Sequence, residues 1–222
     1  MLKSFINFFM YIFIMDKKIN FKKQILVIHG GNVFEHKNDF YKYLKEKNLD
    51  PRLTYYDWKK NLKNDLSEDF EVFLLNMPNK DNADYQAWKI WFEKYFIFLN
   101  KNIPLILIGH SLGGIFLVKY LSENEISNFN ISQLHLVASP FSNLNSLGNP
   151  LRNFSFNVEK LNLIENQVEK IFIYHSKDDF VVPFSHGINF SNIFKSSTFI
   201  KFENLGHINC EKVKEILDNI NC

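Results

Sequence analysis

The chain has 222 residues, a formal net charge of +2, and hydrophobic and charged fractions of 46% and 23%. These values exclude an intrinsically disordered chain, which has few apolar residues and a high net charge. The lysines are scattered among acidic residues, so nucleic acid is not expected as a partner. Two cysteines, Cys210 and Cys222, are too few to indicate a disulfide framework or a thiolate metal site. The length suits one domain with a large core.

The first twenty residues stand apart from this domain. Residues 5–15, FINFFMYIFIM, form an apolar run, but MDKK follows where a signal peptide would have a small-residue cleavage site. The run is also shorter than the roughly 20 apolar residues of a membrane-spanning helix. We therefore predict an N-terminal apolar extension over 1–20, a domain over 21–222 and a cytoplasmic location. The alternatives are a weak membrane association through residues 1–15, or a true start at Met15.

Apolar runs and helical patterns alternate along the chain. Residues 24–31 and 70–78 have the continuous apolar character of buried parallel strands, whereas 36–48 and 83–99 have helical spacing of their apolar residues. The first of these helices is predicted to pack on the sheet. Further strands are predicted at 104–109, 133–140, 170–176 and 197–202, and further helices at 114–121, 184–194 and 210–220. This alternation predicts an α/β fold with a doubly wound, mostly parallel sheet and helices on both faces.

The connection from Asn48 to Asp69 is longer than a compact α/β protein needs. It contains a short helical pattern around Trp58 to Leu66. Two interpretations remain open, a surface insertion and a segment that lies near the functional site, because long connections are disproportionately functional.

The strongest chemical signal is the pentapeptide Gly109-His110-Ser111-Leu112-Gly113. It matches G-x-S-x-G, a sharp strand-to-helix turn that exposes a nucleophilic serine, and it lies between a predicted strand and a predicted helix. Ser111 is therefore the candidate nucleophile. The backbone amide of Leu112, at the start of the helix, is a candidate donor to an oxyanion. The second donor is expected in the turn after the first strand, where we choose the amide of Gly31, with Asn32 as the alternate.

A nucleophilic serine needs a base, and the base needs an acid that orients it. Downstream of Ser111, the loop after strand 170–176 contains Asp178 and Asp179, and the loop after strand 197–202 contains His207. All three loops follow parallel strands, so they are expected at the same edge of the sheet. The sequence contains no metal-ligand spacing, phosphate-binding loop or dinucleotide fingerprint, so no cofactor and no metal are predicted.

The segments GHSLGG, SKDDFVVP and LGHIN resemble the catalytic segments of the α/β-hydrolase superfamily. More narrowly, the chain is similar from about Gln24 onward to small lidless serine hydrolases related to the retinoblastoma-binding serine hydrolase family. The resemblance implies a triad of Ser111, Asp179 and His207, with Asp179 chosen because it lies four residues before Pro183. It also implies an α/β-hydrolase fold without a large lid and carboxylesterase-like activity.

We therefore predict a serine hydrolase that cleaves small carboxylic esters, or amides, through an acyl-enzyme intermediate. Only about thirty residues separate Pro140 from Lys170, too few for a lid domain, so the site is expected to be open and to favour small, soluble esters as partners. The alternative function is a noncatalytic binding or scaffolding protein that retains this fold.

Overall fold

Six parallel strands form the centre of the protein, and the computed structural model describes residues 21–52, 57–141 and 151–222. The strands are β1 (Lys23–Ile28), β2 (Phe70–Leu75), β3 (Leu105–His110), β4 (Ile131–Val137), β5 (Val168–Ser176) and β6 (Thr198–Phe202), in the sheet order β2-β1-β3-β4-β5-β6. Every pairing among the described strands is parallel. The predicted α/β fold is confirmed. Two predicted features lie outside the described residues. They are the apolar extension at 1–20 and residues 142–150, which belong to the connection predicted to be too short for a lid domain.

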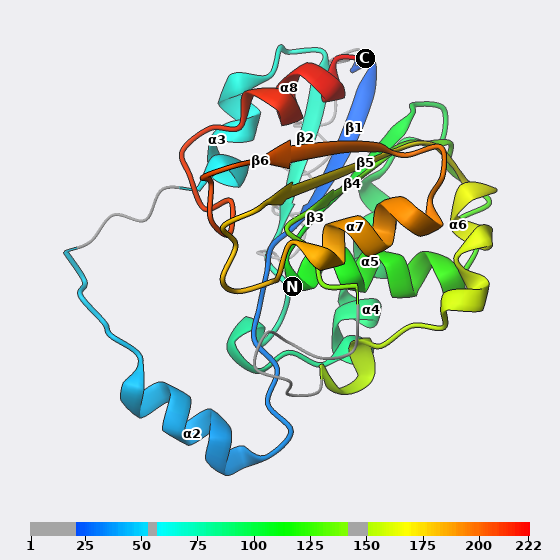
Figure 1. Ribbon diagram of the computed structural model, residues 1–222. Coiled ribbons are helices and arrows are strands. Elements are labelled where there is room, and N and C mark those ends of the chain that lie inside the picture. Colours follow the sequence, from blue (N-terminus) through cyan, green and yellow to red (C-terminus); the bar gives the residue numbers. More distant parts are fainter. Residues whose placement is uncertain (1–20, 53–56, 142–150) are drawn as a thin grey trace, which may run out of the picture.

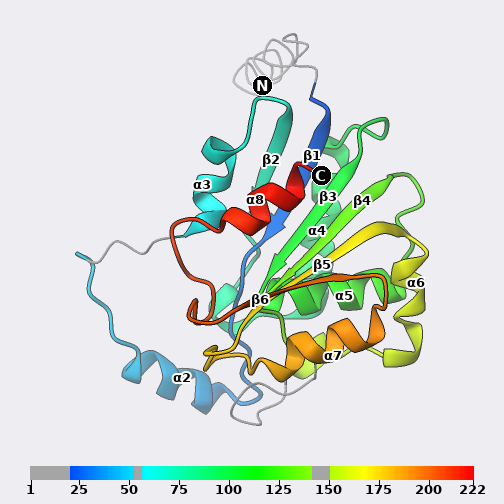
Figure 2. The ribbon, with the colours of Figure 1, turned by 45° about the horizontal axis from the view of Figure 1, so that its top comes forward.

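Helices cover both faces of this sheet (Figures 1 and 2). One face carries α4 (Tyr85–Glu93), α5 (Leu112–Glu123), α6 (Asn162–Glu165) and α7 (Ser185–Ile193), and the other carries α3 (Trp58–Asp65) and α8 (Lys214–Ile220). Short 3₁₀ turns complete the chain: η1 (Lys80–Asn82), η2 (Lys94–Phe98), η3 (Arg152–Phe154) and η4 (Val158–Lys160). Each face of the sheet therefore has its own apolar cluster, as expected for strands that are buried on both sides.

Helix α2 (Lys37–Glu46) departs from the sequence prediction, because it does not pack on the sheet. It has no buried residue and stands away from the body of the protein in both ribbon views (Figures 1 and 2). Its aromatic side chains instead contact the preceding turn, where the Phe34 ring lies 5.5 Å from Phe40 and 5.1 Å from Tyr43. This local contact engages Phe40 and Tyr43, whereas Tyr41 and Leu44, which the pattern assigned to the sheet, remain 45% and 48% exposed.

The helix predicted over 83–99 is also shorter than expected. Helix α4 ends at Glu93 and continues as the 3₁₀ turn η2. Trp88 and Phe92 are fully buried, and both rings meet Phe116 edge-to-face, whereas Trp91 is 41% exposed. The apolar stripe is therefore narrower than the run of aromatic residues suggests, and its buried part fixes α4 against α5.

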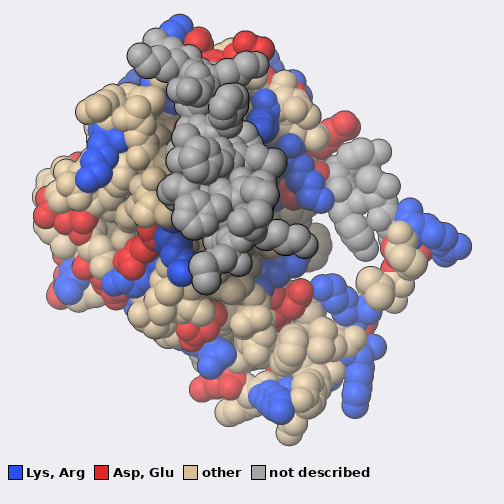
Figure 3. Space-filling view, turned by 180° about the vertical axis from the view of Figure 1, so that it is seen from behind, with Lys and Arg blue, Asp and Glu red and all other residues tan. Residues whose placement is uncertain are grey.

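Two features concern the expectations about nucleic acid and about the membrane: the distribution of surface charge and the character of the helices. Basic and acidic side chains are interspersed over the part of the surface drawn in colour in Figure 3. No helix in the described ranges has the length and apolar character needed to cross a membrane.

The parallel register brings four strand ends to one edge of the sheet. Ile28 pairs with Gly109, His110 with Val137, Val137 with Tyr174, and Ser176 with Phe202. The loops that follow β1, β3, β5 and β6 therefore meet at the carboxyl edge, where open α/β sheets bind their ligands.

His135, on β4, is a buried histidine whose two ring nitrogens both have partners inside the protein. Its Nε2 donates to Gln133 Oε1 and its Nδ1 accepts from the Tyr174 hydroxyl, both at 2.9 Å. Burial lowers the pKa of His135 from its usual value near 6.5 to about 3. Below pH 6.5 the unfolded chain therefore binds a proton that the folded chain does not bind until about pH 3.

This difference predicts a loss of stability in acid. The contribution of neutral His135 to the free energy of unfolding is complete above pH 6.5 and falls as the pH falls toward 3. Between pH 7 and pH 4.5 it should fall by about 2 to 3 kcal/mol. Urea unfolding at several pH values should therefore give a shallower pH dependence for His135→Gln than for the wild type. The same substitution at the exposed His36 should leave the slope unchanged, and equal slopes for His135→Gln and wild type would contradict the prediction.

Candidate active site

Ser111 is the single residue between β3 and α5, and its backbone is strained. Its φ and ψ of 54° and −123° lie in a region that costs an L-residue about 1 to 3 kcal/mol. Two glycines make room for this turn. A Cβ on Gly109 would lie 2.5 Å from the Gly113 carbonyl oxygen, and a Cβ on Gly113 would collide with the Ile28 carbonyl. The structure therefore has the sharp strand-to-helix turn that the sequence motif predicts.

The turn after β1 packs directly against Ser111. A Cβ on Gly30 would lie 3.0 Å from the Ser111 Cβ, and one on Gly31 would lie 3.2 Å from the Leu112 side chain. The amides of Gly31 and Leu112 donate to no backbone carbonyl of the described residues. Both predicted oxyanion donors thus lie beside the serine without a backbone acceptor in the described part of the chain.

The alternate donor, Asn32, is placed differently. Its backbone amide donates to the Lys80 carbonyl at 2.8 Å, so that amide is already engaged in joining the β1 turn to η1. Its side chain amide donates to the Tyr43 hydroxyl at 3.1 Å. The geometry therefore favours Gly31 over Asn32.

Asp179 and His207 form a hydrogen-bonded pair at the same edge. Asp179 follows β5, His207 follows β6, and Asp179 Oδ2 lies 2.8 Å from His207 Nδ1. The other carboxylate oxygen accepts from the amides of Val181 and Val182 at 2.8 and 2.9 Å. Because the carboxylate is the acceptor, Nδ1 carries the proton, and Nε2 of the neutral ring is left free to accept one.

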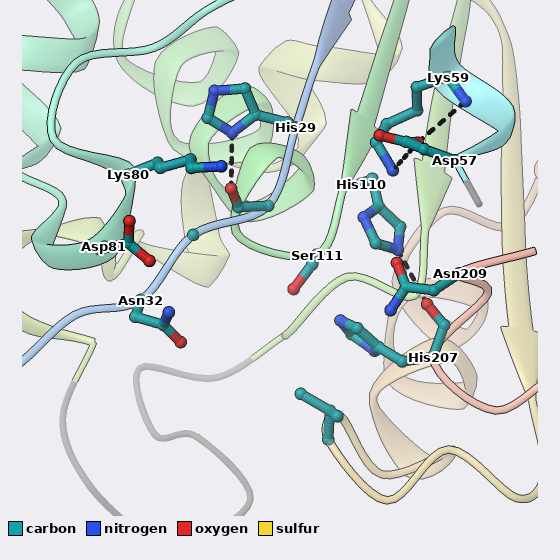
Figure 4. Close-up of a pocket in the computed structure, with 13 residues that line it drawn as sticks. His29, Asn32, Asp57, Lys59, Lys80, Asp81, His110, Ser111, His207 and Asn209 are labelled. Atoms are coloured by element: carbon teal, nitrogen blue, oxygen red, sulfur yellow. Dashed lines mark hydrogen bonds and ion pairs between the residues drawn. The ribbon is translucent and has the colours of Figure 1, made fainter. Parts of the chain in front are cut away.

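The His207 ring is directed toward Ser111 (Figure 4). Both residues line the same pocket, although these two described side chains form no direct hydrogen bond with each other. Catalytic hydrogen bonds are often long in structures without substrate and tighten when it binds. The structure therefore brings together the three side chains that the sequence analysis selected.

A second histidine, His175, also lies beside Asp179. Its Nε2 donates to the Val182 carbonyl at 2.8 Å and lies 3.6 Å from Asp179 Oδ2. Burial lowers the pKa of His175, so the ring is neutral near pH 7. Asp179 therefore has His207 as its one close side-chain partner among the described residues, while His175 supports the loop that carries Val182.

Asp178 forms no hydrogen bond with the described His207 side chain and instead holds the loop that precedes it. Its Oδ1 accepts from the Gly206 amide at 2.9 Å and from the Ser176 hydroxyl at 2.5 Å. The Ser176 oxygen in turn accepts from the Leu205 amide at 2.9 Å. These hydrogen bonds lower the pKa of Asp178, first through Ser176 and then through Gly206. The two adjacent acids thus have separate tasks, and only Asp179 reaches the histidine.

The long connection contributes to the site through Trp58. Its indole Nε1 donates to the Ile208 carbonyl at 3.0 Å, and its backbone amide donates to the Cys210 carbonyl at 2.9 Å. The Trp58 ring meets His110 edge-on, and His110 Nε2 donates to the His207 carbonyl at 2.9 Å. Of the two open interpretations, the structure supports a segment near the site, because Trp58 clamps the His207 loop.

A pocket of about 320 Å³ opens beside Ser111 (Figure 4). Polar side chains dominate its lining, and Val181 contributes the only aliphatic side chain among the described lining residues. The lining consists of His29, Gly30, Gly31, Asn32, Asp57, Lys59, Lys80, Asp81, His110, Ser111, Val181, His207 and Asn209. The sequence analysis did not select Asp57, Lys59 or Lys80. Asp57 and Lys59 lie in the long connection from Asn48 to Asp69, whereas Lys80 lies in a short turn that gave no signal. Over the described ranges, no three His, Cys, Asp or Glu side chains are grouped as metal ligands.

This arrangement of strained serine, histidine and buried aspartate at the carboxyl edge of a parallel sheet defines the α/β-hydrolase class. Within that class, the family model for serine hydrolases matches residues 54–219. The chain therefore belongs to the serine hydrolase family. Ser111, Asp179 and His207 lie inside the matched range, and Gly31 lies before it. No curated protein sequence matches the chain.

Solved structures share the fold at low sequence identity. The ydeN gene product from B. subtilis is 20% identical, with a TM-score of 0.63 over 90% of this chain and 97% of that chain. The meta-cleavage product hydrolase from Pseudomonas fluorescens is 12% identical, with a TM-score of 0.57 over 90% and 91%. The esterase domain of a Rhodothermus marinus protein is 15% identical, with a TM-score of 0.55 over 87% and 80%.

The backbone strain at Ser111 predicts a difference between two inactive variants. Ser111→Gly and Ser111→Ala both remove the hydroxyl, but only glycine adopts a positive φ without steric cost. After the larger entropy of glycine in the unfolded chain is subtracted, Ser111→Gly should be the more stable variant by about 1 kcal/mol. Urea unfolding of both proteins measures this difference. A more stable alanine variant would show that the turn is not strained.

Proposed function

We propose that this serine hydrolase cleaves small, polar carboxylic esters through an acyl-enzyme intermediate on Ser111. The observation that carries the proposal is the Asp179–His207 hydrogen bond beside a serine with a positive φ. Amides are a second substrate class for the same chemistry. The fold shared with the esterase domain from Rhodothermus marinus is in keeping with this proposal.

In the first half of the reaction, His207 Nε2 accepts the Ser111 proton while Oγ attacks the carbonyl carbon of the ester. Asp179 keeps the proton on Nδ1 and stabilises the positive ring that forms. The carbonyl oxygen becomes an oxyanion, which the amides of Gly31 and Leu112 stabilise. When the tetrahedral intermediate collapses, the bond to the alkoxy oxygen breaks and the alcohol leaves with the proton from Nε2.

In the second half, water replaces the alcohol. His207 Nε2 accepts a proton from the water as its oxygen attacks the acyl carbon, and the oxyanion forms at the same two amides. Collapse of this intermediate breaks the bond to Ser111 Oγ, which regains its proton from Nε2. The products are a carboxylic acid and the unchanged enzyme.

The pocket indicates a preference for polar substrates. A volume of about 320 Å³ is at the lower end of the range for ligand sites, and its described lining offers little apolar surface for a long acyl chain. Short esters with polar groups should therefore be better substrates than long-chain lipid esters.

Covalent labelling tests the proposed nucleophile. A serine activated by a base reacts with fluorophosphonate probes, so the wild-type protein should be labelled and mass spectrometry should place the label on Ser111. Ser111→Ala should take up no label and should lose turnover of p-nitrophenyl acetate while remaining folded. Folded wild-type protein that takes up no label would favour the noncatalytic binding function instead.

Two adjacent substitutions test the acid. Asp179→Asn removes the acceptor that orients His207, and in serine proteases the corresponding change costs on the order of 10⁴ in kcat. Asp178→Asn keeps the Oδ1 that accepts from Ser176 and Gly206, so kcat should fall by less than about tenfold. Circular dichroism establishes that both variants are folded. The opposite order of the two effects would transfer the role of the acid to Asp178.

A further inference from the structure

Two lysines from separate segments line the pocket beside Ser111. Lys59 is the second residue of α3, and Lys80 is the first residue of η1. In Figure 4 they lie on either side of Ser111, with Lys59 above His110 and Lys80 beside His29. Neither lysine takes part in the proposed chemistry, so their position next to the nucleophile needs another explanation.

The lining has two lysines and two aspartates, but these four charges are not paired with one another throughout. Lys59 Nζ lies 2.6 Å from Asp57 Oδ1, and Asp81 is paired at 3.1 Å with Lys47, which does not line the pocket. Each of the two carboxylates in the lining therefore has its own lysine. No carboxylate of the described residues lies within 4 Å of the Lys80 ammonium, so Lys80 is the lysine of the described lining that has no ion-pair partner.

The positive charges act on the histidines of the pocket wall. Burial is the main cause that lowers the pKa of His29, and the charges of Lys80 and Lys59 lower it further. Burial and the charge of Lys59 likewise hold the pKa of His110 well below its usual value. Both rings are therefore neutral near pH 7, and the unpaired charge of the described lining is that of Lys80.

Neutral hydrogen-bonding groups complete the lining. Asn32 and Asn209 face the pocket with amides that can both donate and accept hydrogen bonds. One unpaired lysine suits a singly charged carboxylate, whereas a phosphate dianion is usually held by several cations or a bidentate arginine. A partly enclosed pocket screens such a pair less than open solvent does.

We propose that the substrate is an ester that carries a free carboxylate, such as the monoester of a short dicarboxylic acid, and that Lys80 binds this carboxylate. The proposal rests on the proposed esterase function and narrows its substrate class. Lys59, already paired with Asp57, is not available to bind it. The scissile carbonyl is then placed at Ser111 while the second carboxylate remains at the η1 side of the pocket.

The experiment compares two p-nitrophenyl esters, the neutral butyrate and the anionic hemiglutarate, as the ratio of their kcat/KM values. The wild type should prefer the hemiglutarate by on the order of tenfold at low ionic strength, and 0.5 M salt should reduce this preference. Lys80→Met should lower the ratio to near one, and Lys80→Glu should invert it. Lys101→Met, an exposed lysine at the opposite edge of the sheet, is the matched control and should keep the wild-type ratio.

The outcomes separate this inference from the function on which it rests. If both esters are hydrolysed and the ratio is near one in the wild type, or unchanged in Lys80→Met, the carboxylate site is wrong and the esterase proposal stands. If fluorophosphonate does not label Ser111 and neither ester is hydrolysed, both proposals fail together. A second measurement does not need turnover: glutarate should slow fluorophosphonate labelling of the wild type more than that of Lys80→Met, and equal protection would overturn the inference.

Discussion

The site depends on one buried carboxylate. The side chain of Asp179 is fully buried, where an ionised carboxylate is stable only if it is well hydrogen-bonded. Its acceptors are satisfied by His207 and by the amides of Val181 and Val182. These donors come from the loops after β5 and β6, which meet because the two strands are parallel neighbours. The sheet order therefore places His207 beside the turn after β3 that carries Ser111.

Local patterns made most of this fold predictable. The motif around Ser111 specifies a strand, a turn and a helix through glycines that only that geometry requires, and the parallel strands bring its loop to the edge that carries His207. The choice of Asp179 over Asp178 came from resemblance to a family, because both acids have the same local signal. Their different hydrogen bonds depend on Gly206 and His207, which approach only after β5 and β6 pair.

Local sequence patterns do not predict contacts between residues that are far apart in the sequence. Trp58 clamps Ile208 across 150 positions of sequence, and no periodicity in either segment indicates this pairing. Helix α2 shows the reverse case, since its apolar spacing indicated packing on the sheet, but only Phe40 and Tyr43 have a described aromatic contact with the preceding turn, through Phe34, and Leu44 is exposed. The lysines of the pocket are inconspicuous in a chain with scattered charges, and their significance follows only from the positions of Asp57 and Asp81.

The groups that react and most of the other side chains that line the pocket come from different parts of the chain. The reacting groups lie on the loops after β3, β5 and β6, whereas Asn32, Asp57, Lys59, Lys80 and Asp81 all belong to the stretch between β1 and α4. At the turn that carries Ser111, a side chain on Gly109 or Gly113 would collide with the backbone, so these two positions require glycine. Changes in the β1–α4 stretch, outside Gly31 and strand β2, can therefore alter which molecules enter the pocket while the reacting groups stay in place. The specificity of the pocket can thus change independently of its chemistry, provided that Gly31 keeps its place and Trp58 still holds the loop of His207.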